Sequence, residues 1–222
     1  MTAVRALIFD MDGTMVDSMP WHARSLAEFT RRHGIVIDLD ELMRRITGLT
    51  GIECMRELFG RDLGAEQAQV LIHEKEAIFR ELFRPAFVEV AGFRRFAAEA
   101  MRRGLKVAIG TAGDKDNVAF TLSHLKMEPP PHAVVGGDEG LPGKPEPAIF
   151  LEAARRLGVA PRHCIVFEDS PFGIESARRA GMRAVAVCTG HQADQLAGPH
   201  VVAQVRDYHE LRQSNFLESL DA

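Results

Sequence analysis

Cysteine is scarce in this sequence, and the three that occur, Cys54, Cys164 and Cys188, stand far apart. They form no CxxC pair and no Cys/His ligand spacing, so the pattern supports neither a disulfide scaffold nor a zinc site. An odd number of isolated cysteines is typical of free thiols in a reducing compartment. We therefore expect buried, reduced cysteines.

Long apolar runs and an excess of positive charge are missing as well. No run approaches the roughly eighteen residues that a membrane-spanning helix needs, and charged residues begin within "FDMD" near the start of the chain. The formal net charge is −4, which argues against a nucleic-acid partner. The expectation is a cytoplasmic protein that contacts neither membrane nor nucleic acid.

Five short apolar runs do occur, and they predict buried parallel strands: "AVRALIFD", "LKVAIGT", "HAVVGG", "HCIVFED" and "RAVAVCT". Helical patterns separate them, such as the apolar stripe Phe93, Phe96, Ala97 and Ala100, which ends at Gly104. Strands that alternate with helices indicate an α/β fold with a doubly wound parallel sheet, a Rossmann-like core.

One segment interrupts this alternation, because the chain from about Met19 to Arg84 has helical periodicity throughout. Leu39, Leu42, Met43 and Ile46, for example, are spaced as an amphipathic helix requires. We predict a catalytic core of residues 1–17 and 87–222, with an all-helical cap subdomain, residues 18–86, inserted after the first strand.

Polar residues follow several of the predicted strands. Ligands bind at the carboxyl ends of strands in open α/β sheets, so these residues should meet at one edge. Asp10 and Asp12 follow the first strand, Thr111 the second, Lys144 comes after the third, and Glu168 and Asp169 end the fourth.

Such a set suits phosphoryl chemistry. Carboxylate oxygens are ligands for Mg²⁺, and a carboxylate held by Mg²⁺ and a lysine can attack phosphorus as a nucleophile. Asp12, two residues after Asp10, could protonate the leaving oxygen and later activate water. Thr111 and Lys144 could hold the phosphate oxygens.

Four motifs in this order resemble the haloacid dehalogenase superfamily over nearly the whole chain: "DMDGT", Thr111, Lys144 in "GKPEP", and "FEDS". The helical insertion is similar to the cap of the β-phosphoglucomutase-like subfamily. The resemblance implies Asp10 as nucleophile and Asp12 as general acid/base. It also implies that Asp10, the Asp12 carbonyl and Asp169 hold Mg²⁺, with Glu168 contributing indirectly or through water.

The resemblance also indicates which residues bind substrate: Thr111, Ala112, Lys144, His22, Thr47, Gly48 and Lys75. Mutases of the subfamily carry a lysine and an arginine where this chain has Thr47 and Gly51. The loss of two cations that would bind a second phosphate favours a phosphatase.

For two of these cap residues, Lys75 and His22, a role in substrate binding and a purely structural position are equally weighted interpretations. Lys75 lies in an apolar helical stripe and either points at the substrate or extends its head to water. His22 either contacts substrate or lies on the surface. Outside the cap, we expect Ser170 and Asp114 to begin helices, and Thr111 could cap a helix as well.

The sequence as a whole predicts a Mg²⁺-dependent phosphatase that acts on a small phosphorylated metabolite, with sugar phosphates favoured, through an aspartyl-phosphate. A β-phosphoglucomutase and a non-catalytic phosphate-ligand binding or regulatory protein are the alternatives. We expect a monomer.

Overall fold

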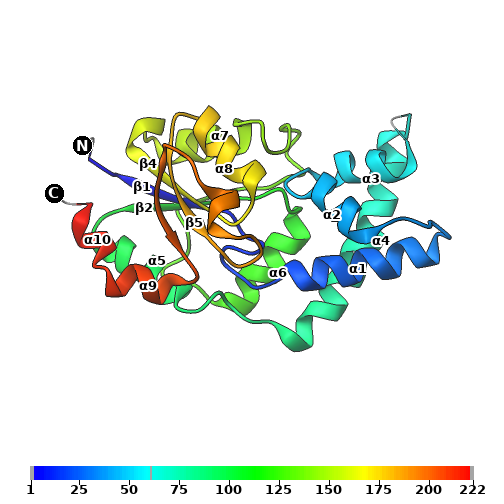
Figure 1. Cartoon of the computed structure of the whole chain (residues 1–222), viewed down its shortest axis with the longest axis horizontal. Helices are drawn as coiled ribbons and strands as arrows, with labels where there is room; N and C mark the ends of the chain where they lie inside the picture. The colour runs from blue at the N-terminus through cyan, green and yellow to red at the C-terminus, as the bar shows by residue number, and fades with distance from the viewer. Residues whose placement is uncertain (1–2, 61, 221–222) are drawn as a thin grey trace.

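A six-stranded parallel sheet forms the centre of the protein, which a computed structural model describes for residues 3–60 and 62–220 (Figure 1). The strand order is β3-β2-β1-β4-β5-β6, so β1 lies between β2 and β4. The strands are β1 (Ala6–Phe9), β2 (Lys106–Gly110), β3 (Ala133–Val135), β4 (Cys164–Glu168), β5 (Arg183–Val187) and β6 (Val201–Val205). This is the predicted Rossmann-like core.

Alternate residues of each strand enter separate cores on the two faces of the sheet. Leu7 and Phe9 pack with one set of helices, whereas Ala6 and Ile8 pack with the other. The first core involves α5 (Phe93–Arg102), α6 (Lys115–Leu125), α9 (Tyr208–Gln213) and α10 (Phe216–Ser219), and the second involves α7 (Ala148–Leu157) and α8 (Pro171–Arg179). Within the described residues, 3₁₀ turns occur at Arg84–Ala86, Pro161–His163 and Ala193–Leu196.

The sixth strand was not among the predicted ones. β6 lies at the edge of the sheet, and Val202 is exposed, so its residues are not buried on both faces. An edge strand of this kind lacks the continuous apolar run that marks the central strands. Its sequence therefore does not show the pattern that predicts a buried strand.

The inserted segment folds into four helices that lie beyond the carboxyl ends of the strands (Figure 1). They are α1 (Met19–Arg32), α2 (Leu39–Ile46), α3 (Gly51–Phe59) and α4 (Ala65–Phe83). Two small apolar clusters hold them together, one around Phe29 and Ile72 and the other around Leu26 and Leu42. The helical cap is therefore a packed unit with its own apolar core.

Local capping explains where several helices begin. The Asp38 side chain accepts a hydrogen bond from the Glu41 amide at 3.0 Å, and Thr50 and Glu53 form a capping box. Ser170 and Asp114 begin α8 and α6 as predicted. Thr111 caps no helix, so that expectation was wrong: Asp114, three residues later, takes the position.

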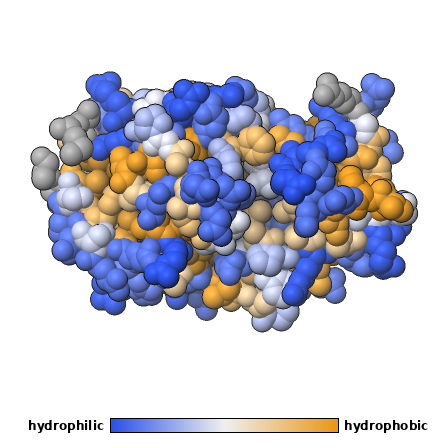
Figure 2. Space-filling model, viewed as in Figure 1, coloured by the Kyte–Doolittle hydropathy of each residue, from blue (hydrophilic) through white to orange (hydrophobic). Residues whose placement is uncertain are grey.

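The surface drawn in Figure 2 mixes hydrophilic and hydrophobic residues, and hydrophobic ones gather at the far end of the cap. Among the cap's large hydrophobic residues, Val36 between α1 and α2 and Phe59 at the end of α3 are exposed. None of the helices in the described part of the chain is long and apolar enough to span a membrane.

Candidate active site

The carboxyl end of β1 carries the first two candidate residues. β1 ends at Phe9, and the chain turns through Gly13, which has a φ of +79°. A Cβ at Gly13 would lie 2.1 Å from Asp169 Oδ2, so only glycine lets this turn pass so close to the end of β4. The turn therefore brings the "DMDGT" and "FEDS" motifs into contact.

Lys144 lies at the centre of this site. Its Nζ donates hydrogen bonds to Asp10 Oδ1 at 2.5 Å and to Glu168 Oε1 at 2.6 Å, and only 2% of its side chain is exposed. Burial acts to lower the pKa of Lys144, but the two carboxylates raise it above its ordinary value. Lys144 is therefore a buried cation.

One lysine does not balance the negative charge of this site. Burial raises the pKa of Asp10 to about 7, with Lys144 opposing the shift and Glu168 adding to it. Burial raises the pKa of Asp169 well above its ordinary value, and the nearby Glu168 and Asp10 raise it further. A further cation would relieve this repulsion.

The same carboxylates meet the requirements of a metal site. Asp10, Glu168 and Asp169 each offer an oxygen within 4.8 Å of the others, and Asp169 Oδ2 is buried without a hydrogen-bond partner. Both oxygens of Glu168 already accept hydrogen bonds, from Lys144 and from Ser170. Hard oxygen ligands with one unpartnered buried atom fit a divalent ion such as Mg²⁺.

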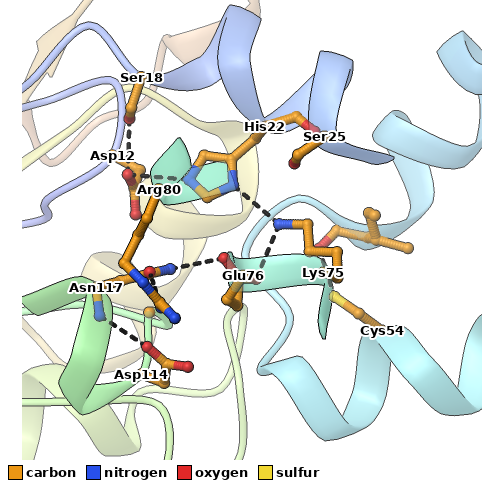
Figure 3. Close-up of polar contacts among 12 residues, drawn as sticks. Asp12, Ser18, His22, Ser25, Cys54, Lys75, Glu76, Arg80, Asp114 and Asn117 are labelled. Carbon is orange, nitrogen blue, oxygen red and sulfur yellow. Dashed lines mark hydrogen bonds and ion pairs between the residues drawn. The ribbon is translucent and has the colours of Figure 1, made fainter. Parts of the chain in front are cut away.

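Asp12 faces a different set of groups (Figure 3). Ser18 donates a hydrogen bond to Asp12 Oδ1 at 2.6 Å, and His22 Nε2 lies 3.1 Å from the same oxygen. Burial acts to raise the pKa of Asp12, but His22 and the Ser18 hydroxyl lower it below its ordinary value. In this arrangement Asp12 is an ionised carboxylate. The side chain of Asp12 is not part of the carboxylate cluster of Asp10, Glu168 and Asp169.

His22 and Lys75 are both directed into the protein (Figure 3). The His22 ring stacks on Phe79, with centroids 3.7 Å apart, and Lys75 Nζ contacts His22 Nδ1 at 3.0 Å. Because an ammonium only donates, the Nδ1 atom of His22 accepts in this contact. The surface alternative for His22 and the solvent alternative for the Lys75 head are therefore wrong.

Further residues, which were not among the predicted site residues, continue this network from the cap into the core (Figure 3). Lys75 pairs with Glu76 at 2.8 Å, and Glu76 Oε2 accepts a hydrogen bond from the Asn117 amide at 2.7 Å. Asn117 also accepts a hydrogen bond from Arg80 at 2.8 Å. An acid beside a lysine in a buried helical stripe was the only available signal for Glu76, and Asn117 gave none.

The remaining predicted residues line the same cavity, whose volume is about 560 Å³: Thr47, Gly48, Thr111 and Ala112. The Thr47 hydroxyl donates to the Met43 carbonyl, and the Gly48 carbonyl accepts from the Lys144 amide at 3.0 Å. The latter contact places the cap loop directly on the core. The structure therefore brings every predicted site residue to one cavity between cap and core.

The chain matches one protein family and is similar to several characterised proteins. Residues 4–181 match the family described as haloacid dehalogenase-like hydrolase. The chain is 32% identical to a fructose-1-phosphate phosphatase of Escherichia coli over 181 residues, which is 82% of this chain and 95% of the relative. It is 31% identical to a β-phosphoglucomutase of Bacillus subtilis over 214 residues, 92% of this chain and 91% of the relative.

A solved structure agrees with the fold. The crystal structure of a hydrolase from Pseudomonas syringae superposes with a TM-score of 0.83 at 25% identity, covering 96% of this chain and 97% of the other. The similarity extends over cap and core together.

Proposed function

Because the chain belongs to the haloacid dehalogenase-like hydrolase family, we propose that it is a Mg²⁺-dependent phosphatase of small phosphate monoesters, with sugar phosphates as the favoured class. The observation that carries the proposal is the buried set of Asp10, Lys144 and Asp169 at a cavity that Asp12 also lines. Binding of a phosphate alone would not need the second carboxylate, which argues against a non-catalytic role.

Asp10 and Asp169 would hold the Mg²⁺ ion, together with the Asp12 carbonyl, and Glu168 would adjoin it. Members of the family generally use this ion. When bound, Mg²⁺ neutralises charge on the phosphate oxygens and keeps the carboxylates ionised. Lys144 would supply the second positive charge, because it is already fixed against Asp10.

The proposed reaction has two steps, both carried out by residues of the turn after β1. Asp10 attacks phosphorus, the ester P–O bond breaks, and Asp12 gives its proton to the leaving alcohol oxygen. The negative phosphate beside Asp12 raises its pKa and favours the protonated form that this step needs. Asp12 then takes a proton from water, which attacks the aspartyl-phosphate and releases inorganic phosphate.

A phosphoglucomutase is the closest alternative, since one relative bears that name. Such an enzyme must hold a second phosphate while the first is transferred. In this chain Thr47 and Gly51 stand where mutases carry cations, and the Thr47 hydroxyl is bonded to its own helix. These residues favour hydrolysis of a monophosphate.

We further propose that the enzyme acts as a monomer.

Substitution of the nucleophile tests the proposal. We expect Asp10→Asn to reduce phosphate release from a panel of sugar phosphates, nucleotides and acetyl phosphate by more than about a thousand-fold, because the attacking carboxylate is gone. EDTA should stop the wild-type reaction. The matched control is Asp17→Asn, which changes an exposed aspartate of the same loop and should keep wild-type rates.

Full activity of Asp10→Asn would contradict the mechanism. A bisphosphorylated intermediate that accumulates with β-glucose 1-phosphate would instead favour the mutase.

A further inference from the structure

We infer, on the basis of the proposed phosphatase function, that the substrate class is narrower than sugar phosphates in general: the preferred substrate has few free hydroxyl groups and carries a hydrocarbon-rich group at the end distal to its phosphate. The cavity has two chemically different ends. The core end holds the carboxylates and Lys144, whereas most of the aliphatic and thioether side chains that line the cavity lie at the cap end. A phosphate monoester of an alcohol with few hydroxyl groups would match both ends.

All four cap helices contribute apolar side chains to this wall. Leu26 comes from α1, Met43 and Ile46 from α2, Ile52 from α3 and Ile72 from α4, and all five line the cavity. Leu26, Ile46 and Ile72 also belong to the two cap clusters, so packing within the cap holds them in place. The apolar wall is therefore part of the cap core itself.

Apart from the exposed Arg56 and Gln69, polar groups within the wall are already bonded to the protein. The Thr47 hydroxyl donates to the Met43 carbonyl at 2.7 Å, and the Thr50 hydroxyl donates to Glu53 at 2.7 Å. The Cys54 thiol is directed to backbone carbonyls. A substrate hydroxyl placed here would lose hydrogen bonds to water without replacement by these groups, whereas a methylene would gain by leaving water.

The buried cations at the cavity are also committed. Lys75 contacts His22 and Glu76, and Lys144 contacts two carboxylates. Arg56 lines the cavity too, but its residue is exposed. The cap end thus provides dispersion contacts for an organic group, and a cavity of about 560 Å³ is large enough for a ring of that kind.

A matched pair of esters tests this inference. Cyclohexylmethyl phosphate and glucose 6-phosphate both carry a six-membered ring on a CH₂–O–phosphate group, and they differ mainly in the hydroxyls. We expect kcat/KM in Mg²⁺ to be at least about 10-fold higher for the cyclohexyl ester, since one methylene in an apolar pocket can change it by that factor. Acetyl phosphate, which has almost no organic group, reports the basic phosphatase reaction.

Met43→Gln places a polar side chain of similar size in the wall and should lower the cyclohexyl-to-glucose ratio about five-fold or more. Met101→Gln is the matched control, because Met101 is also half-buried but packs in the core away from the cavity. It should leave the ratio unchanged.

The outcomes separate the two proposals. Hydrolysis of acetyl phosphate supports the phosphatase function whatever happens to the two ring esters. The apolar-substrate inference is overturned if glucose 6-phosphate is used as well as or better than the cyclohexyl ester. It is also overturned if both of these esters are rejected. An unchanged ratio in Met43→Gln overturns it too. If the wild type hydrolyses none of the three compounds, the proposed function fails, and the inference fails with it.

Discussion

Gly13 is the residue on which the geometry of the carboxylate site depends most directly. Its φ of +79° is costly for other residues, and a Cβ there would overlap Asp169. Thr189 also donates a hydrogen bond to the Gly13 carbonyl at 2.6 Å. A single methyl group at this position would therefore push apart the two motifs that carry the carboxylates.

We expect Gly13→Ala to lose at least about 100-fold in kcat/KM, because an ångström of displacement at a reacting group has costs of this order. Its free energy of unfolding should fall by about 1–3 kcal/mol through backbone strain and the clash. Phosphate-release assays and urea unfolding measure the two effects.

Gly34→Ala is the control for strain alone. Gly34 has a φ of +64°, but a Cβ there would meet nothing within 4 Å. This variant should lose about 1–2 kcal/mol of stability and keep its activity. Equal activity in both variants would show that the closeness of Gly13 to Asp169 does not matter for the reaction.

At the scale of elements, helices α4 and α6 join the cap to the core through one buried amide. Asn117 on α6 donates to Glu76 and accepts from Arg80, which lie one turn apart on α4. Glu76 in turn holds Lys75, which contacts His22. The amide therefore supports the network that ends at Asp12.

Removal of this amide should loosen the cap and disturb catalysis together. We expect Asn117→Ala to lower the free energy of unfolding by about 1–3 kcal/mol, since Glu76 Oε2 loses its donor and Arg80 loses its acceptor. A fall in kcat/KM of roughly ten-fold should accompany it, because His22 loses its support. Ser123→Ala, at an exposed position on α6, is the control. Loss of stability with unchanged kinetics would limit Asn117 to a structural role.

For the molecule as a whole, the buried carboxylates make stability depend on pH. The pKa of Asp10 is raised from an ordinary 3.8 to about 7, and that of Asp169 is raised as well. The folded state therefore binds more protons than the unfolded state in this range. The resulting stabilisation is complete below about pH 4 and is lost as the pH rises toward 7.

We therefore expect the metal-free wild type, in EDTA, to lose stability relative to Asp10→Asn between about pH 5 and 8. Mg²⁺ should restore more stability at the upper end of this range, because it binds the ionised carboxylates. Urea unfolding of both proteins over this range, with EDTA or Mg²⁺, measures both effects. Parallel pH curves in EDTA would contradict the raised pKa of Asp10.

Much of the architecture followed from the order of the residues alone. Apolar runs marked five of the six strands, and helical spacing marked the cap, because burial on two faces or on one stripe leaves these patterns in a chain. The carboxyl ends of parallel strands share one edge, so the meeting of Asp10, Lys144 and Asp169 could be predicted as well.

Tertiary structure alone decided the direction of the cap side chains and the contacts across the cavity. Lys75 and His22 are 53 residues apart, and Glu76 and Asn117 are 41 apart. Periodicity shows which face of a helix is buried, but it does not show which polar group lies opposite. The edge strand β6 and the apolar wall of the cavity could not be predicted from sequence patterns, because both depend on which elements pack together.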